Sequence, residues 1–433
     1  MGRPELLSPS RSTVGRRRPV ALALVAVLAS SLLAACGGDS GKPTLTWYIN
    51  PDAGGQDAVA KKCSTGAYTI ETQVLPQDAS QQRIQLARRL AAGDDSIDLM
   101  SIDPPFTAEF ANAGYLAPIP AELATKLEEQ SFQGATTAAT WEDELVVAPF
   151  WSNTQVLWYR KSFVDKVGID MSKPVTWDQI ITTASENGGT VGVQADKYEG
   201  YVVWINALIE GAGGSIIENA EKGVEATVTV NSPAGEQAAK VINELANSNA
   251  APADLSVSDE GTAGTTFGSD SGAFLVNWTY IFHNYDESDP AVAKDIGYTK
   301  YPETVAGKDS RPPYGGIGIG VSQTSRYIDE AMQAVECMTS AESQGINAEL
   351  TGNMPASPGG YDYAPLKKIY PPDLLALFQQ SVDDAAPRSV TPYWSDISSA
   401  IQSTWHSPTS VDESTPEESA TFIEDVLMGD TLL

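Results

Sequence analysis

The sequence predicts an α/β fold whose central sheet is mainly parallel. Segments with strand-like and helix-like patterns alternate between residues 44 and 102, and this β-α-β-α-β order is typical of a parallel sheet flanked by helices. The chain has 433 residues, more than one domain usually contains, so two domains are expected. Aromatic residues make up 8% of the chain, which indicates a packed globular core and not a disordered stalk.

The first five elements are expected at residues 44–49, 55–63, 68–75, 79–92 and 97–102, in the order strand, helix, strand, helix, strand. Segment 79–92 is predicted to be an amphipathic helix because its apolar residues recur at helical spacing. The strand at 97–102 ends directly before Asp103. Ligands of parallel α/β sheets bind beyond the carboxyl ends of the strands, so Asp103 lies where a ligand is expected.

The middle of the chain continues the alternation of strands and helices. Strands are expected at residues 144–159, 190–194, 272–277 and 297–301, and helices at 161–167, 177–186, 200–210, 234–246 and 325–339. A glycine-rich run, Tyr314 to Gly320, precedes the last of these helices. The C-terminal part is expected to be largely helical, with breaks at prolines, and the sequence contains no internal repeats or coiled-coil heptads.

Residues 1–35 have the pattern of a secretory signal. Arg16, Arg17 and Arg18 precede an almost uncharged apolar run, and a pair of small residues then leads to Cys36. This order resembles the bacterial lipobox, in which the chain is cut just before a cysteine that becomes acylated. Residues 36–43 are then expected to be a flexible tether.

The alternative for this segment is an uncleaved transmembrane helix with an incidental cysteine. The apolar run from Val20 to Leu33 is short for a membrane span and is interrupted by Ser30 and Ser31. A lipid anchor is therefore the favoured interpretation, and the mature protein is expected on the extracellular face of the cell membrane.

The chain is strongly acidic, with a formal net charge of −29. Removing residues 1–35, which carry five arginines and one glutamate, changes this charge to −33. A surface of this sign repels phosphate backbones and anionic lipid headgroups, so nucleic acid is excluded as a partner. The charge instead suits a protein that stays soluble beside an anionic cell surface.

If Cys36 is acylated, Cys63 and Cys337 remain as a pair in an oxidising compartment, which favours a disulfide between them. The alternative is two buried free thiols, because cysteine is among the most frequently buried residue types.

Several motifs spread over the chain resemble those of the extracellular sugar-binding proteins of ABC importers. Each is weak alone, but they occur in the family's order over nearly the whole mature chain. They are residues 46–48, 103–114, 148–150, 157–160, 174–179, 211–214, 276–278 and 352–355. Within this family, residues 82–90, 107–110 and 152–160 are similar to the actinobacterial trehalose-binding lipoproteins.

The resemblance implies a Venus-flytrap, or periplasmic-binding-protein, fold in which two α/β lobes close on a sugar by hinge bending. Lobe 1 would contain residues 44–149 and 302–341, and lobe 2 residues 150–301 and 342–433. Both Cys63 and Cys337 would then lie in lobe 1, which supports their pairing.

A sugar presents C–H-rich ring faces that pack on aromatic rings, and hydroxyls that bond to planar polar side chains. By the resemblance, Trp278 stacks on the sugar and Asn277 accompanies it, although core packing is the alternative role for Trp278. Asp103 would accept from sugar hydroxyls or, alternatively, cap the following helix. Asn153 would bond to the ligand or serve as a turn residue of the hinge.

Glu260 matches a sugar-binding acid of the trehalose-binding lipoproteins, with a helix N-terminal charge as its alternative role. Arg388 would bridge two hydroxyls with its guanidinium fork, or form a salt bridge instead. Gly315 and Gly316 would let the backbone approach the ligand closely, or serve only a tight strand. Weaker candidates from cleft-lining regions complete the set: Gln82, Asn50, Tyr201 and Trp394. The other tryptophans considered, Trp47, Trp141, Trp158, Trp177 and Trp204, are expected mostly in the core.

Enzyme interpretations find little support. The two histidines, His283 and His406, lack the spacing of a zinc site, and no phosphate-binding loop occurs. A Gly-Asp-Ser-Gly run at 38–41 lies in the tether, where no catalytic triad could be preorganised. A secreted glycosidase, which needs two cleft carboxylates, is the enzyme alternative, and a surface adhesin would lack the alternating two-lobe order.

The sequence therefore predicts a monomeric solute-binding lipoprotein without cofactor or metal. It would capture a disaccharide, trehalose by the narrower resemblance or another oligosaccharide such as maltose, and deliver it to ABC permease subunits in the membrane.

Overall fold

The computed structural model describes residues 41–431. The predicted acylation site Cys36 lies outside the described residues, as do the leader and most of the tether. The described residues from Lys42 onward form one compact unit, which contains every element discussed below. Within the described part of the chain, no helix has both the length and the apolar character needed to cross a bilayer.

An eight-stranded sheet runs through this unit. Its strands are β1 (Thr44–Ile49), β2 (Thr69–Val74), β3 (Leu99–Ile102), β6 (Ala148–Arg160), β7 (Thr190–Gly192), β10 (Gly272–Trp278), β11 (Ile296–Thr299) and β12 (Tyr314–Val321). They follow the order β2-β1-β3-β12-β6-β10-β7, with β11 also paired to β6. Two small hairpins lie apart from this sheet: β4 (Thr140–Trp141) with β5 (Glu144–Leu145), and β8 (Ile217–Glu218) with β9 (Thr227–Val228).

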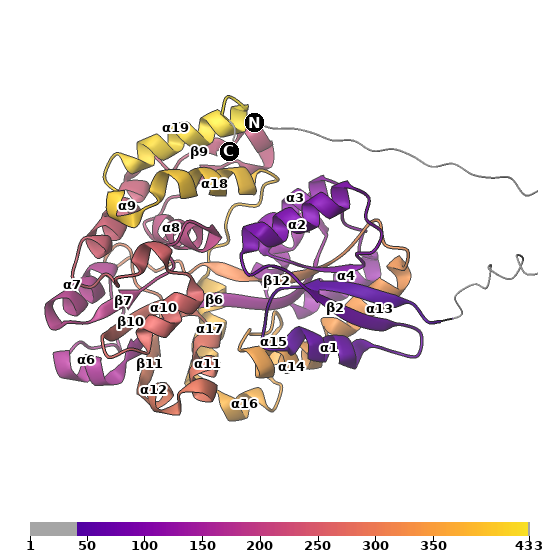
Figure 1. Cartoon of the computed structure of the whole chain (residues 1–433), viewed down its shortest axis with the longest axis horizontal. Coiled ribbons are helices and arrows are strands. Elements are labelled where there is room, and N and C mark those ends of the chain that lie inside the picture. Colours follow the sequence, from indigo (N-terminus) through magenta and orange to yellow (C-terminus); the bar gives the residue numbers. More distant parts are fainter. Residues whose placement is uncertain (1–40, 432–433) are drawn as a thin grey trace, which may run out of the picture. The chain divides into compact units, whose positions relative to one another are not determined.

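Strand β6 joins the two parts of the sheet. Its first half, residues 148–154, pairs antiparallel with β12, whereas residues 155–160 pair antiparallel with β10 and β11. The outer pairs β1–β2, β1–β3 and β10–β7 are parallel, as the β-α-β order predicts. Antiparallel pairing therefore occurs where the chain crosses from one part to the other and returns, as Figure 1 shows around β6 and β12.

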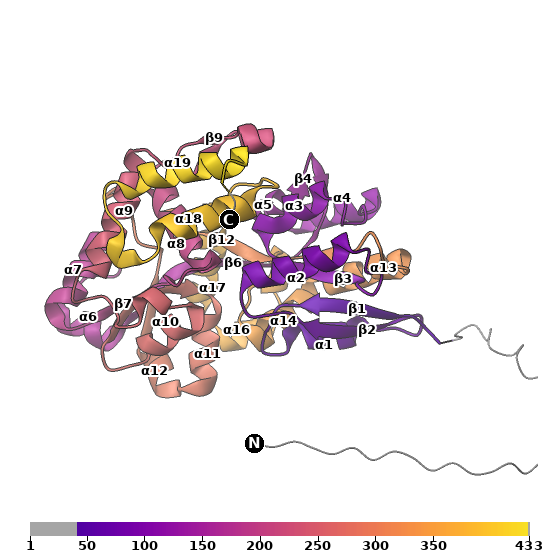
Figure 2. The same cartoon turned by 45° about the horizontal axis from the view of Figure 1, so that its top comes forward.

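Helices cover both faces of this sheet (Figures 1 and 2). Those packed around β1, β2, β3 and β12 are α1 (Gly55–Cys63), α2 (Ala79–Ala91), α3 (Thr107–Asn112), α4 (Ala121–Gln130), α5 (Gln133–Ala138), α13 (Ile328–Met338), α14 (Ala341–Thr351) and α15 (Pro358–Tyr361). Those of the other part are α6 (Lys161–Val167), α7 (Trp177–Asn187), α8 (Glu199–Gly211), α9 (Pro233–Ala246), α10 (Glu260–Phe267), α11 (Tyr280–Ser288), α12 (Pro290–Asp295), α16 (Leu366–Ile369), α17 (Pro372–Asp384), α18 (Trp394–Trp405) and α19 (Thr415–Met428). Helix α18 packs against α8 and α19.

The core is built from the apolar faces of these helices and from both faces of the sheet. Burial of the central strands on both sides explains why β6 is apolar over most of its length. Trp47, Trp158, Trp177 and Trp204 are fully buried, as predicted, whereas Trp141 lies half-buried in the β4–β5 hairpin.

Cys63 and Cys337 form a disulfide, as predicted, and their Cα atoms are 5.7 Å apart. The bond joins the last residue of α1 to the last turn of α13, across 274 residues of sequence. The alternative of two free thiols is therefore wrong.

Most of the expected elements are present, and strand 44–49 and helices 55–63 and 161–167 have the predicted bounds. The α/β class is confirmed. The glycine-rich run 314–320 forms the strand β12. Its glycines offer little side-chain packing, but backbone pairing with β3 on one side and β6 on the other stabilises the strand. The six-residue helices α3 and α5 have too few turns to show a periodic apolar face.

Candidate ligand-binding site

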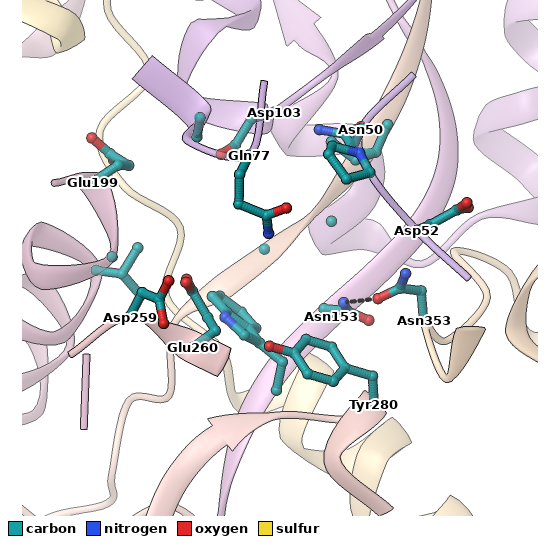
Figure 3. A pocket seen from close by; sticks show the side chains of 18 of the residues that line it. Asn50, Asp52, Gln77, Asp103, Asn153, Glu199, Asp259, Glu260, Tyr280 and Asn353 are labelled. Carbon is teal, nitrogen blue, oxygen red and sulfur yellow. Dashed lines mark hydrogen bonds between the residues drawn. The ribbon is translucent and has the colours of Figure 1, made fainter. Parts of the chain in front are cut away.

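A pocket of about 640 Å³ lies beyond the carboxyl end of β3, where ligands of parallel sheets are expected. Its walls come from segments far apart in sequence: the loops after β1, β2 and β3, the start of α8, the start of α10, and strands β6 and β12. Figure 3 shows carboxylates and amides from these segments pointing into one space. The size is within the range of roughly 300–1,000 Å³ that is usual for small-molecule sites.

One side of the pocket is lined with amides. The side-chain nitrogen of Asn50 donates to Oε1 of Gln82 over 2.6 Å, and Gln82 in turn donates to the carbonyl of Pro76. The side chain of Asn153 donates to Oδ1 of Asn353 over 2.8 Å, the bond drawn in Figure 3. These bonds fix the amide planes before any ligand arrives. The buried Oδ1 of Asn50 has no hydrogen-bond partner within the described residues.

The opposite side is acidic. Glu199, Asp259 and Glu260 gather there, at the starts of α8 and α10 (Figure 3). Asp259 caps α10 by accepting from the backbone of Thr262 over 2.7 Å. Glu260 accepts from the hydroxyl of Tyr198 over 2.8 Å.

Arg388 connects this acidic side to the end of β3. One of its terminal nitrogens lies 2.6 Å from Oε1 of Glu199 and the other 3.1 Å from Oδ1 of Asp103. The guanidinium is buried, and its Nε has no partner among the described residues. The segment between α17 and α18 thus places a cation between one carboxylate at the start of α8 and another at the end of β3.

Trp278 supplies an aromatic surface at the end of β10, where its side chain is only partly buried. The ring lies directly over Gly315: a Cβ added at this glycine would come within 2.7 Å of the indole. Gly316 has a φ of 136°, and a Cβ there would meet the carbonyl oxygen of Trp151 at 2.2 Å. The missing side chains of the two glycines therefore make room for the indole of Trp278 and for the backbone of β6. The sequence instead predicts that these glycines make room for the ligand.

Comparison with known proteins identifies the family. The family model described as "Bacterial extracellular solute-binding protein" matches residues 52–345, about two thirds of the chain. The chain belongs to this family.

Among curated relatives, this solute-binding protein is 21% identical over 346 residues to the diacetylchitobiose binding protein DasA of Streptomyces coelicolor, covering 75% of this chain and 78% of that protein. Its fold matches maltose-bound MalE3 of T. maritima with a TM-score of 0.79, at 20% identity over 90% of this chain and 100% of the other. The GacH receptor of Streptomyces glaucescens matches with a TM-score of 0.75, at 21% identity and the same coverage of both chains. The two-lobe binding-protein fold is thereby confirmed, and the family is one of binding proteins, not enzymes.

Nine of the predicted site residues of this solute-binding protein line the pocket: Asn50, Gln82, Asp103, Asn153, Glu260, Trp278, Gly315, Gly316 and Arg388. Several alternative roles can be resolved. The side chain of Asp103 forms no cap bond to the following turn, and Asn153 lies within β6 and not in a turn. Arg388 both lines the pocket and forms ion pairs.

The other three predicted residues, Asn277, Tyr201 and Trp394, do not line the pocket and are fully buried. Successive strand residues face opposite sides, so Asn277 points away from the side of Trp278, and its amide donates to the backbone of Glu260. Tyr201 lies about half a turn from Glu199 on α8, and its hydroxyl donates to the carbonyl of Trp405. Trp394 donates from its indole nitrogen to Glu199.

Sequence reasoning missed several polar residues of the pocket: Asp52, Gln77, Tyr198, Glu199, Asp259, Tyr280, Asn284 and Asn353. Asp259 carries a detectable signal, because it directly precedes α10 and caps its start. Asp52 lies two residues before Gly54, the N-cap of α1, and accepts from the backbone of Gly54 and Gln56. Asn353 lies in the family motif 352–355. Among the described residues, no cluster of three or more metal-ligating side chains occurs.

Burial raises the pKa of Asp103 to about 6, an effect that Arg388 opposes and the neighbouring charge of Glu199 reinforces. Burial likewise raises the pKa of Glu260. Arg388 stays charged, because the two carboxylates outweigh its burial and raise its pKa. The pocket thus contains acids whose charge is costly in the ligand-free protein.

A consequence for stability follows from Asp103. Its pKa is higher in the folded protein than the usual value near 3.8, so its contribution to stability is complete below about pH 4 and is lost as the pH rises through about 6. The melting temperature of the ligand-free protein should therefore fall between pH 4.5 and pH 7, and Asp103→Asn should flatten this slope. Circular dichroism melts of both proteins across this range check the prediction, and equal slopes would contradict it.

Proposed function

We propose that this protein captures a disaccharide in the pocket and delivers it to an ABC importer. The observation that carries the proposal is the position of Trp278, which offers an aromatic surface to a pocket whose other walls hold fixed amides and carboxylates. A pyranose ring has an apolar face that packs on an indole and a rim of hydroxyls that needs such planar polar partners.

The distribution of polar groups suits an uncharged, hydroxyl-rich ligand. Asp103 and Glu260 can accept from hydroxyls, while the amides of Asn50 and Asn153 can both donate and accept. Arg388 supplies donors near the same position. An anionic ligand would meet five carboxylates in this pocket, those of Asp52, Asp103, Glu199, Asp259 and Glu260, against the single cation Arg388 among its lining residues.

Trehalose is the proposed disaccharide. Its support is the similarity of residues 82–90, 107–110 and 152–160 to trehalose-binding lipoproteins, since Gln82 and Asn153 from two of these stretches line the pocket. A maltose-type oligosaccharide is the second candidate, because a maltose-bound protein shares the fold at a TM-score of 0.79.

Delivery requires an anchored, monomeric receptor with a cleft that closes. We place the lobes at residues 44–149 with 302–341 and at 150–301 with 342–433, and the acyl anchor on Cys36. A ligand that contacts both lobes shifts the population toward the closed form by its higher affinity for that form. The permease subunits would then recognise the closed form.

Isothermal titration of the mature domain against trehalose, maltose, sucrose, cellobiose and diacetylchitobiose tests the proposal. Trehalose should bind with the highest affinity, and heat from maltose alone would select the second candidate. Absence of binding to every sugar, or conversion of one into monosaccharides, would refute the function.

A further inference from the structure

Glu199 is an acid that sequence reasoning did not select. Its side chain is only 4% exposed, and it lies at the first position of α8. Oε1 accepts from Arg388 over 2.6 Å and from the indole nitrogen of Trp394 over 2.9 Å, while Oε2 accepts from the hydroxyl of Ser398. All of its partners thus come from α18 and the segment before it.

Two features make this a suitable place for a permanent negative charge. The carboxylate lies at the N-terminal ends of both α8 and α18, where helix dipoles favour an anion. It is also paired with a buried cation, which compensates for much of the cost of removing both charges from water.

Arg388 depends on this anchor for its orientation. One terminal nitrogen is bound to Glu199, which leaves the other to reach Asp103 at 3.1 Å. Without Glu199, Asp103 would be the only carboxylate partner of Arg388 among the described residues, and the guanidinium would be free to turn toward it.

We propose that Glu199 is a positioning residue for solute binding: it holds Arg388 in the orientation that joins α8 and α18 to Asp103 at the end of β3. This inference rests on the proposed function, because it concerns how the same pocket is kept ready for its ligand. Glu199 acts through Arg388, and Trp394 and Ser398 hold Glu199 in turn.

The arrangement also couples the charge of Glu199 to the titration of Asp103. The charged groups acting on Asp103 are Arg388 and Glu199. The charged group that acts on the pKa of Asp396, in α18, is Arg83 of α2. Glu260 lies on the acidic side of the pocket. Removing the negative charge of Glu199 should therefore lower the pKa of Asp103, which a purely steric role would not do.

The test compares Glu199→Gln, Trp394→Phe and Ser399→Ala in the mature protein. Glu199→Gln should weaken trehalose binding by about tenfold or more, and Trp394→Phe, which removes one hydrogen bond to Glu199, should weaken it less. Ser399→Ala is the matched control and should bind as wild type, because its hydroxyl donates only to the carbonyl of Ser395 in the same helix.

The second measurement needs no sugar. The titration of Asp103, followed by carboxyl NMR in the ligand-free protein, should have its midpoint at lower pH in Glu199→Gln. An unchanged midpoint, or wild-type affinity of Glu199→Gln for trehalose, would overturn the inference. If the wild-type protein binds none of the sugars, the proposed function fails, whereas the midpoint still decides whether Glu199 controls the Arg388–Asp103 pair.

Discussion

Trp278→Ala should weaken sugar binding by about 100-fold and leave the melting temperature of the ligand-free protein nearly unchanged. The ring is partly exposed and lines the pocket, so a sugar would cover the part of its apolar surface that is still open to solvent. Covering about 100 Å² or more of aromatic surface contributes roughly 2.5–3 kcal/mol, which corresponds to about two orders of magnitude in affinity. Calorimetric titration and a thermal melt of the same preparation measure both quantities.

Trp158→Ala is the matched control for this prediction. Trp158 is fully buried, donates to the carbonyl of Asn277, and packs edge-on against Phe378 and Tyr298. Its loss should lower the melting temperature strongly, as truncation of core aromatics costs about 3–5 kcal/mol. If Trp278→Ala melts like Trp158→Ala, then Trp278 belongs to the core and the stacking role is wrong.

Gly315→Val gives an independent test of the same aromatic surface. The added side chain would push against the indole of Trp278, because even a Cβ lies 2.7 Å from it. Binding should weaken although Trp278 itself is unchanged, and wild-type affinity of this variant would show that the position of the ring is not important.

Loss of the Cys63–Cys337 disulfide is expected to have the largest effect on stability. The bond closes a loop of 274 residues, and the chain-entropy model assigns a contribution of about 5–6 kcal/mol to loops of this size. The double variant Cys63→Ser, Cys337→Ser should therefore unfold at a markedly lower urea concentration. Sugar affinity should stay close to that of the wild type at low urea, because neither cysteine lines the pocket.

Urea titrations with and without a reducing agent separate the disulfide from the substitutions. Reductant should destabilise the wild-type protein and have no effect on the double variant. Equal unfolding midpoints for oxidised and reduced wild type would contradict the prediction, and a loss of sugar affinity in the double variant would show that α1 and α13 influence the pocket.

The sequence is most informative where one periodicity dominates. Segment 44–49 is apolar and β-prone, and 55–63 lies between clear breaks, so their bounds can be predicted from local pattern alone. The direction of strand pairing around β6 cannot be predicted from local pattern. It depends on two distant segments, residues 272–278 and 314–321, that both pair with this strand.

The candidate site divides in the same way. Asp103 and Trp278 follow strands, and their positions at strand ends are visible in the sequence. Glu199 has no such signal, because its importance comes from Arg388 and Trp394, which lie 189 and 195 residues away. The family resemblance offers Trp394 only as a weaker candidate from a cleft-lining region, and the packing of α18 on α8 shows that its indole nitrogen donates to an acid.

The place of β12 in the sheet has a consequence for the order in which the protein can fold. This strand lies between β3 and β6, yet it comes from residues 314–321, more than 150 residues after β6 begins. While the chain is being synthesised, β3 and β6 have no hydrogen-bonding partner between them until β12 has emerged. The sheet therefore cannot be completed before residues 314–321 are available. Cys337 follows the end of β12 by 16 residues, so the disulfide with Cys63 can form only after every strand of the sheet has been synthesised.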